Sequence, residues 1–282
     1  MKTIPVLLMA IILTASGVLS AAEPTGTAAN AATVPTVDEI VKKANLMAYY
    51  QGLDGKSKVA MTITDKQGRT RTRDFIILRK TIENGGDQKY FVYFLSPADV
   101  RKTVFMVHKH TAQGADDDRW LYLPSLDLVK RIAAGDKRTN FVGSDFLYED
   151  VSGRNLAEDK HELVSTTDEF FVVKNTPLKP ETVEFVYYNV SIDRKNYMPM
   201  KMEYYDKQGQ MFRSIETKKV EDIAAKEGDK DVTYPTATEA VVKDLRTGSI
   251  TEMKFSEVKY NLNLEDIFTE RYLHRPPTEA MR

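Results

Sequence analysis

Three methionines and a tyrosine alternate along one short stretch of the chain, at Met198, Met200, Met202 and Tyr204. In an extended strand every second side chain points to the same face, so these four side chains share one face. Thioether side chains adapt to irregular apolar spaces, which suits a flexible acyl chain as well as a protein core. Pro199 indicates a strand at a sheet edge, or one whose missing N–H points away from a partner. The pattern therefore predicts either the wall of an apolar cavity or gap-filling core.

The same reasoning selects further candidates for the wall of this cavity on two other strands, which are Val59, Met61, Ile63, Phe91, Tyr93 and Leu95. The last three belong to the run 90–95, in which both alternating faces are apolar. Such a strand has to be covered on both sides. A curved sheet wrapped around an apolar interior, with helices packed on or into it, meets that demand, and a sandwich is the rival arrangement. The sequence leaves open which face is the inner one.

Residues that often catalyse reactions or bind metals lack the necessary spacing in this chain. The Gly-Ser-Asp sequence at 143–145 has neither the second glycine nor the strand-to-helix context of a nucleophile elbow. His108 and His110 would share a strand face, but no third ligand follows at a recognisable spacing. The three aspartates at 116–118 lack the alternating ligands and the glycine of a calcium loop. We therefore predict no enzyme, no metal and no cofactor, with a hydrolase kept as the third-ranked alternative.

The middle of the chain, from 127 to 163, has weak periodicity and predicts a long ordered loop or lid. Its aromatic and charged side chains are candidates for the mouth of the cavity, and they are Arg131, Arg138, Phe141, Asp145, Phe146 and Tyr148. We expect Arg131 or Arg138 to pair with a carboxylate of Asp145, Glu149 or Asp150. Such a segment would lie near the mouth of a barrel.

The N-terminus and the composition indicate an exported protein. A lysine at position 2, an apolar run at 4–13 and small residues at 20–22 form a signal peptide over 1–22, which we expect to be cleaved near Ala22. Residues 23–36 read as a flexible lead, and 37–282 as a single domain. The chain has no cysteine, which excludes disulfides and the lipoprotein route, so we expect a soluble periplasmic monomer. A net charge of −1 with interspersed signs does not indicate a nucleic-acid partner.

Hydrophobic periodicity predicts one helix followed by a mainly β (α+β) domain. Thr36 and Glu39 have the spacing of a capping box, and apolar residues recur on one helical face until Gly52. Period-two patterns then predict antiparallel strands at 59–64, 70–80, 88–95, 103–109, 119–123, 169–174, 181–190, 198–205, 210–221, 236–244 and 249–260. A last helix is expected to begin at an Asn263 cap and to end before the prolines at 276–277.

Several motifs resemble those of a known family, and they are DRWLYLPS at 118–125, VKRI at 129–132, FVGSDFLYED at 141–150, LSPADVR at 95–101 and MPMKMEYY at 198–205. Together they resemble the outer membrane lipoprotein-sorting protein family, the relatives of the periplasmic carrier LolA. The resemblance extends from about 37 to 274. It implies a LolA/LolB-like fold, an incomplete and strongly curved antiparallel β-barrel that encloses helices and leaves a lipid-binding cavity.

The resemblance also implies a function. A carrier or chaperone of this family would bind a lipid or the acyl chains of a lipoprotein and move it from an inner-membrane exporter toward an outer-membrane acceptor. The exporter would be the lipoprotein-release machinery or one of the resistance-nodulation-division type. The family's functional arginine cannot be assigned among Arg71, Arg73 and Arg79. The alternative is a non-carrier periplasmic adaptor module that docks on an exporter or an envelope complex.

Overall fold

The computed structural model describes residues 35–281, and the expected signal peptide at 1–22 lies outside them. The described chain forms one sheet of 13 antiparallel strands, in the spatial order β6-β5-β4-β3-β2-β1-β13-β12-β11-β10-β9-β8-β7. The strands are β1 (Asp54–Thr64), β2 (Thr70–Thr81), β3 (Gln88–Ser96), β4 (Val104–Lys109), β5 (Asp118–Leu123), β6 (Leu128–Arg131), β7 (Asp159–Thr166), β8 (Phe170–Pro177), β9 (Tyr187–Asp193), β10 (Pro199–Tyr205), β11 (Met211–Glu227), β12 (Lys230–Asp244) and β13 (Ser249–Tyr260).

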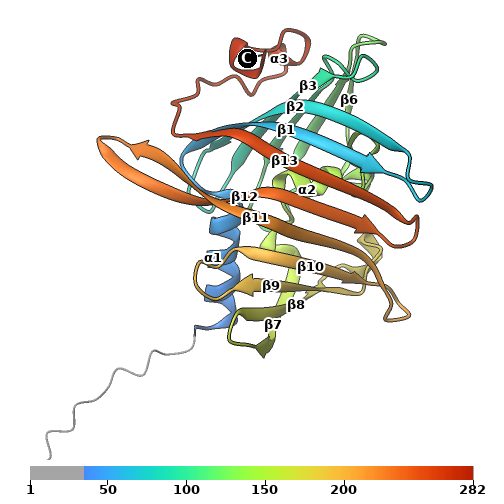
Figure 1. Ribbon diagram of the computed structural model, residues 1–282, viewed down its shortest axis with the longest axis vertical. Coiled ribbons are helices and arrows are strands. Elements are labelled where there is room, and N and C mark those ends of the chain that lie inside the picture. Colours follow the sequence, from blue (N-terminus) through green and yellow to red (C-terminus); the bar gives the residue numbers. More distant parts are fainter. Residues whose placement is uncertain (1–34, 282) are drawn as a thin grey trace, which may run out of the picture. The chain divides into compact units, whose positions relative to one another are not determined.

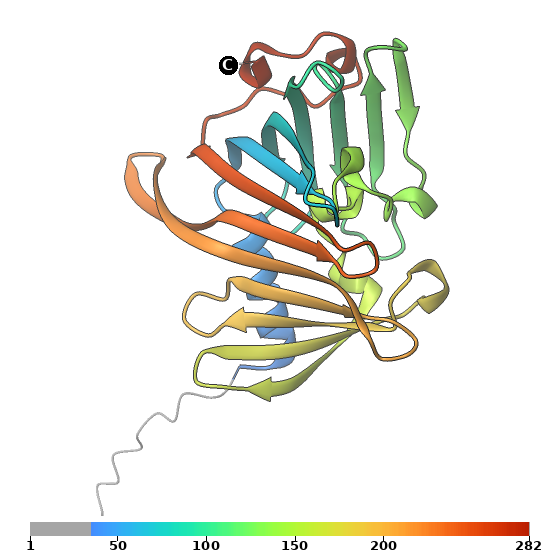
Figure 2. The same cartoon turned by 45° about the vertical axis from the view of Figure 1, so that its right-hand side comes forward.

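The sheet is strongly curved and does not close (Figure 1, Figure 2). Strands that follow each other in sequence pair as neighbours within two series, and the pairing of β1 with β13 joins those series. This leaves β6 and β7 as the two edges. The incomplete, curved antiparallel barrel expected from the sequence is therefore confirmed.

Helix α1 (Val37–Tyr49) crosses the concave side of the half of the sheet that contains β7, β8, β10 and β12 (Figure 2). Its first turn has the predicted capping box, because the Thr36 hydroxyl accepts from the Glu39 N–H and the Glu39 carboxylate accepts from the Thr36 N–H. Ile40, Val41 and Ala44 are its buried residues. The helix therefore packs one apolar face into the concavity, as its sequence pattern predicts.

Both faces of β3 are covered, as the sequence requires. Tyr90, Val92 and Phe94 point to the concave side, where they join one apolar cluster. Phe91 and Tyr93 point to the convex side, where they join another. The C-terminal segment 262–281 covers this convex side and contains α3 (Arg271–His274) and α4 (Thr278–Met281).

The middle of the chain contains more regular structure than its sequence predicts. Within 127–163 lie β6, the start of β7, helix α2 (Tyr148–Ser152), and the short 3-10 helices Ala134–Asp136, Phe141–Gly143 and Leu156–Glu158. A fourth 3-10 helix, Pro180–Thr182, precedes β9. Strands β11 and β12 are longer than expected and pair with each other up to Glu227 and Lys230.

The last helix is the clearest error of the sequence prediction. Asn263 has φ of 56°, whereas a helix cap at its N-terminus needs an extended backbone. The chain continues without helix to α3, which begins at Arg271. Across residues 35–281, no helix has the length and apolar character needed to span a membrane.

Candidate functional site

A cavity of about 390 Å³ lies between α1 and the concave face of the sheet. Its walls are mainly apolar and come from α1, from the inward side chains of both halves of the sheet, and from the segment 141–156. The apolar residues from the sheet include Ile77, Val92, Val173, Val190, Ile192, Ile215, Ala240, Met253 and Phe255. The cavity thus lies between the core of the β1 to β5 half and the core under α1.

The methionine strand contributes to this cavity in part. Met198, Met202 and Tyr204 line it, and so does Pro199, whereas Met200 does not. The register of β10 against β9 shifts between Pro199 and Lys201. A bulge of this kind breaks the strict alternation of side chains, which explains why Met200 leaves the face it was expected to share.

The other predicted wall residues lie elsewhere, and this part of the prediction is corrected. Phe91, Tyr93 and Leu95 belong to the convex side and pack against the C-terminal segment. The remaining three, Val59, Met61 and Ile63, face the concave side but are absent from the cavity wall. They are buried in a cluster with Phe75, Phe94, Phe105 and Phe141, whose rings occupy the space in front of them.

The segment expected to form a lid packs inside the concavity. Phe141 lies against the rings of Phe75, Phe94, Phe105 and Tyr148, and Phe141 and Phe146 also line the cavity. The side chain of Asp145 accepts hydrogen bonds from Ser249 and Thr251. Arg131 pairs with Asp118 at the exposed edge strand, away from these carboxylates. Residues 141–152 therefore form a plug of the concave side, and the aromatic side chains of this plug are part of the cavity wall.

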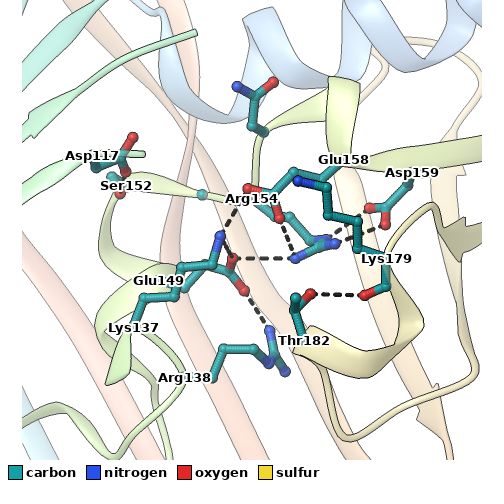
Figure 3. Close-up of polar contacts among 12 residues, drawn as sticks. Asp117, Lys137, Arg138, Glu149, Ser152, Arg154, Glu158, Asp159, Lys179 and Thr182 are labelled. Atoms are coloured by element: carbon teal, nitrogen blue, oxygen red, sulfur yellow. Dashed lines mark hydrogen bonds and ion pairs between the residues drawn. The ribbon is translucent and has the colours of Figure 1, made fainter. Parts of the chain in front are cut away.

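Buried ion pairs hold this plug in place (Figure 3). Glu149 contacts Lys137 Nζ at 3.2 Å, Arg154 Nη1 at 3.3 Å and the Arg138 guanidinium. The expected pairing of Arg138 with a carboxylate of this segment is thus present. Burial alone would raise the pKa of Glu149, but the charges of these three cations outweigh it and lower the pKa from 4.5 to about 2.

The same network connects the plug to distant parts of the sheet. Arg138 forms a second, bidentate pair with Glu184, which precedes β9, and Arg154 pairs with Glu158 and with Asp159 of β7. A sequence gives no local signal for a partner 46 positions away. Sequence reasoning therefore found Arg138 but missed Arg154 and Glu184.

The charged side chains in the cavity wall have partners within the protein. Asp150 pairs with Arg213 of β11. Among the three candidate arginines only Arg79 reaches the wall, where it donates to the Gly52 carbonyl at 3.2 Å. Arg71 donates to the carbonyl of Gly143, and Arg73 pairs with Asp99. The wall therefore combines a large apolar area with charged groups that are paired within the protein.

The residues considered above for metal binding or catalysis, His108, His110 and Ser144, make contacts within the protein. The His108 Nε2 lies 2.7 Å from the Phe268 carbonyl, and His110 lies between Asp87 and Asp118. The Ser144 hydroxyl donates to the Phe141 carbonyl at 2.7 Å. Within residues 35–281, no three His, Cys, Asp or Glu side chains are grouped so that they could hold a metal ion.

Comparisons with known proteins agree with this architecture. A protein-family model described as "Uncharacterized protein" matches residues 86–275. No curated protein matches the chain in a sequence comparison. A crystal structure of a DUF1329 family protein from Desulfovibrio piger is similar, with 26% identity, a TM-score of 0.73, and coverage of 84% of this chain and 97% of the other.

Two further solved structures are similar to this chain. A putative outer membrane lipoprotein-sorting protein domain from Vibrio parahaemolyticus has 28% identity and a TM-score of 0.72, and the match covers 84% of this chain and 97% of that one. A LolA superfamily protein from Nitrosomonas europaea has 20% identity and a TM-score of 0.62, with 85% and 100% covered, and supports the fold. The chain therefore belongs to the family that the matching model describes, and its fold is similar to those of the DUF1329, lipoprotein-sorting and LolA superfamily structures.

Proposed function

We propose that the protein is a periplasmic carrier that holds an acyl chain of a lipid or an acylated protein in the cavity between α1 and the sheet. The observation that carries this proposal is the volume of about 390 Å³ within largely apolar walls. Ligand pockets run from about 300 to 1,000 Å³, and one chain of about fourteen to sixteen carbons fits the lower part of that range. Burial contributes about 0.8 kcal/mol per methylene, so half of such a chain gains on the order of 6 kcal/mol before ordering costs.

The open space favours a carrier over the adaptor alternative. An adaptor that only docks on an exporter has no need of an internal cavity, and its concave side would be filled by side chains. Here aromatic rings fill the concavity beside β3 and β4, yet space remains beside α1.

The cellular route is part of the proposal. The Vibrio relative is described as a putative lipoprotein-sorting domain, which supports transfer across the periplasm after export through the signal peptide at 1–22. In this scheme the domain at 37–282 receives its cargo from an inner-membrane exporter and delivers it to an outer-membrane acceptor. The exporter is either the lipoprotein-release machinery or one of the resistance-nodulation-division type.

A matched pair of substitutions on β10 tests the proposal. Met202 lines the cavity and Met200, two positions away, does not. A carboxylate at position 202 would be buried against an acyl chain, which costs several kcal/mol. We expect Met202→Asp to weaken binding of a fluorescent sixteen-carbon fatty acid at least tenfold, and Met200→Asp to leave it within about twofold of wild type. Urea unfolding of both variants separates lost binding from lost folding.

A second variant tests the volume without adding a charge. Ala240 lies in the cavity wall, and Ala240→Trp would place an indole in the space of the acyl chain. We expect this protein to fold and to lose the lipid that mass spectrometry finds in organic extracts of the wild type. Unchanged lipid content in both Met202→Asp and Ala240→Trp would contradict the carrier proposal.

A further inference from the structure

A second, smaller cavity adjoins the first one. It has a volume of about 200 Å³ and shares Asn45, Arg154 and Leu156 with the wall of the apolar cavity. Its other wall residues are Tyr50, Gly85, Lys109, Thr111, Asn155 and Ala157. Two of these side chains, Lys109 and Arg154, are cations, and none is a carboxylate. The two cavities are therefore neighbours, and one has a mainly apolar wall while the other has a positively charged wall.

Of the two cations in this wall, Lys109 is the candidate ligand contact, because it has an N–H donor left. Its side chain comes from β4 and is 3% exposed. The Nζ donates to the carbonyl oxygens of Ser152 and Gly153, the latter at 3.1 Å. An ammonium has three donors, so one remains. Between residues 35 and 281, no carboxylate forms an ion pair with this Nζ.

The acidic groups around Lys109 are engaged with arginines and lysines. Asp117 pairs with Arg119 at 2.5 Å, and Glu149 is held by its own three cations. Burial lowers the pKa of Lys109 to about 8, with nearby carboxylates only partly opposing the effect. A buried charge without an anionic contact is costly, and a ligand anion would relieve that cost.

Lys109 contacts residues that also line the larger, apolar cavity. The Gly153 carbonyl that accepts from Lys109 and the Tyr49 ring, 5.3 Å from its Nζ, both belong to residues that line the apolar cavity. Gly153 has φ of 75°, and a Cβ at this position would lie 2.5 Å from the Tyr49 ring. Glycine thus permits the close approach that brings the ammonium to the boundary of the acyl compartment.

We propose that the cargo is a single-chain anionic amphiphile, whose acyl chain lies in the larger cavity and whose carboxylate or phosphate headgroup binds Lys109 in the smaller one. This inference rests on the proposed carrier function. Arg154 is not a second headgroup contact in this proposal, because Glu149, Glu158 and Asp159 already pair with its guanidinium. A volume of about 390 Å³ accommodates one long chain and leaves no space for three.

The test compares probes that share a sixteen-carbon chain and differ in headgroup. Delipidated mature protein is titrated calorimetrically with palmitate, palmitoyl lysophosphatidic acid and hexadecanol. We expect the two anions to bind at least tenfold more tightly than the alcohol. A preference for palmitate indicates a carboxylate cargo, and a preference for the lysophosphatidic acid indicates a phosphate cargo.

Substitutions then assign the effect to Lys109. Lys109→Met should weaken binding of the preferred anion about tenfold and leave hexadecanol unchanged, while Lys109→Arg should restore most of the loss. Lys80→Met is the matched control, because Lys80 also donates to a backbone carbonyl, that of Leu264, but on the convex side. It should change neither affinity.

The outcomes separate the two proposals. Equal binding of palmitate and hexadecanol to the wild type would overturn the headgroup site and leave the carrier function standing. An equal loss for anion and alcohol in Lys109→Met would have the same meaning, since it would reflect damage to the cavity. If Lys109→Met fails to fold, the comparison of headgroups on the wild type still decides. Failure of every probe to bind would overturn both proposals.

Discussion

The two faces of the sheet around β3 carry similar apolar side chains but differ in what covers them. On the convex side the cover is the segment 262–281, and Phe268, Leu273 and Ala280 are completely buried in it. On the concave side the plug at 141–152 covers β3 with the Phe141 ring, and a cavity of about 390 Å³ remains between the plug, the sheet and α1. Similar apolar faces therefore produce a filled core on one side and leave a cavity on the other.

The geometry of the covering segments explains this difference. The stretch before α3 has little regular structure, and left-handed backbone at Asn261 and Asn263 lets it follow the curved sheet. Contacts of Lys89 with Asp266 and of His108 with the Phe268 carbonyl hold it down. Helix α1 is straight, about 20 Å long for its 13 residues, and cannot follow a curved surface over that length. A rigid cover over a curved sheet leaves space.

The largest expected effect belongs to the convex side. Phe268 is completely buried, and Phe268→Ala should lower the free energy of unfolding by about 3 to 5 kcal/mol. Because the change lies on the opposite face from the cavity, affinity for a fatty acid should stay within about twofold of wild type wherever the protein is folded. Urea unfolding and fluorescent fatty-acid titration measure the two quantities. A tenfold loss of affinity in a folded variant would show that the faces are coupled.

The concave side should respond more strongly to acid. The Glu149 pKa of about 2 in the folded protein, against 4.5 as its ordinary value, corresponds to about 3 kcal/mol of stability. Because the pKa is lowered, this contribution is present above pH 4.5 and is lost as the pH falls toward 2. Glu149→Gln should lose similar stability at neutral pH and show a flatter acid profile in this window. Glu279→Gln in α4 of the convex cover is the control and should keep the wild-type profile, whereas an identical profile for Glu149→Gln would contradict the assignment.

Local patterns in the sequence predicted most of the fold. The capping box at Thr36 and Glu39 and the alternation along β1 depend on residues close in sequence, so propensity and period specify them. The two apolar faces of β3 also required two covers, which the structure has. What covers the convex face was not predictable in form, because the cover after Asn263 is held by contacts with strands far away in sequence.

The site was less predictable than the fold for two physical reasons. Strict alternation assigns Met200 to the face of Met198 and Met202, but the bulge in β10 depends on pairing with β9 and leaves no pattern in the sequence. The network around Glu149 joins Lys137 and Arg138 to Glu184 through space. Alternation also cannot say which face of a strand is concave, which is why Phe91 and Tyr93 were expected in the cavity and lie outside it.

The smallest expected effect is that of Ile77 in β2, which is compared with its neighbour Ile76 on the opposite face. Ile76 is 3% exposed and packs under the C-terminal segment, whereas Ile77 lines the cavity. Removing a packed side chain leaves a void and loses contacts on all sides, so Ile76→Ala should cost about 2 to 5 kcal/mol. The side of Ile77 that faces the cavity has few partner atoms, so Ile77→Ala should cost only about 1 kcal/mol in the delipidated protein.

Urea unfolding with and without palmitate sharpens the test, because a bound acyl chain would supply the missing contacts and raise the cost of Ile77→Ala, while leaving that of Ile76→Ala unchanged. Equal costs for the two variants without ligand would mean that the concave side is as well filled as the convex one.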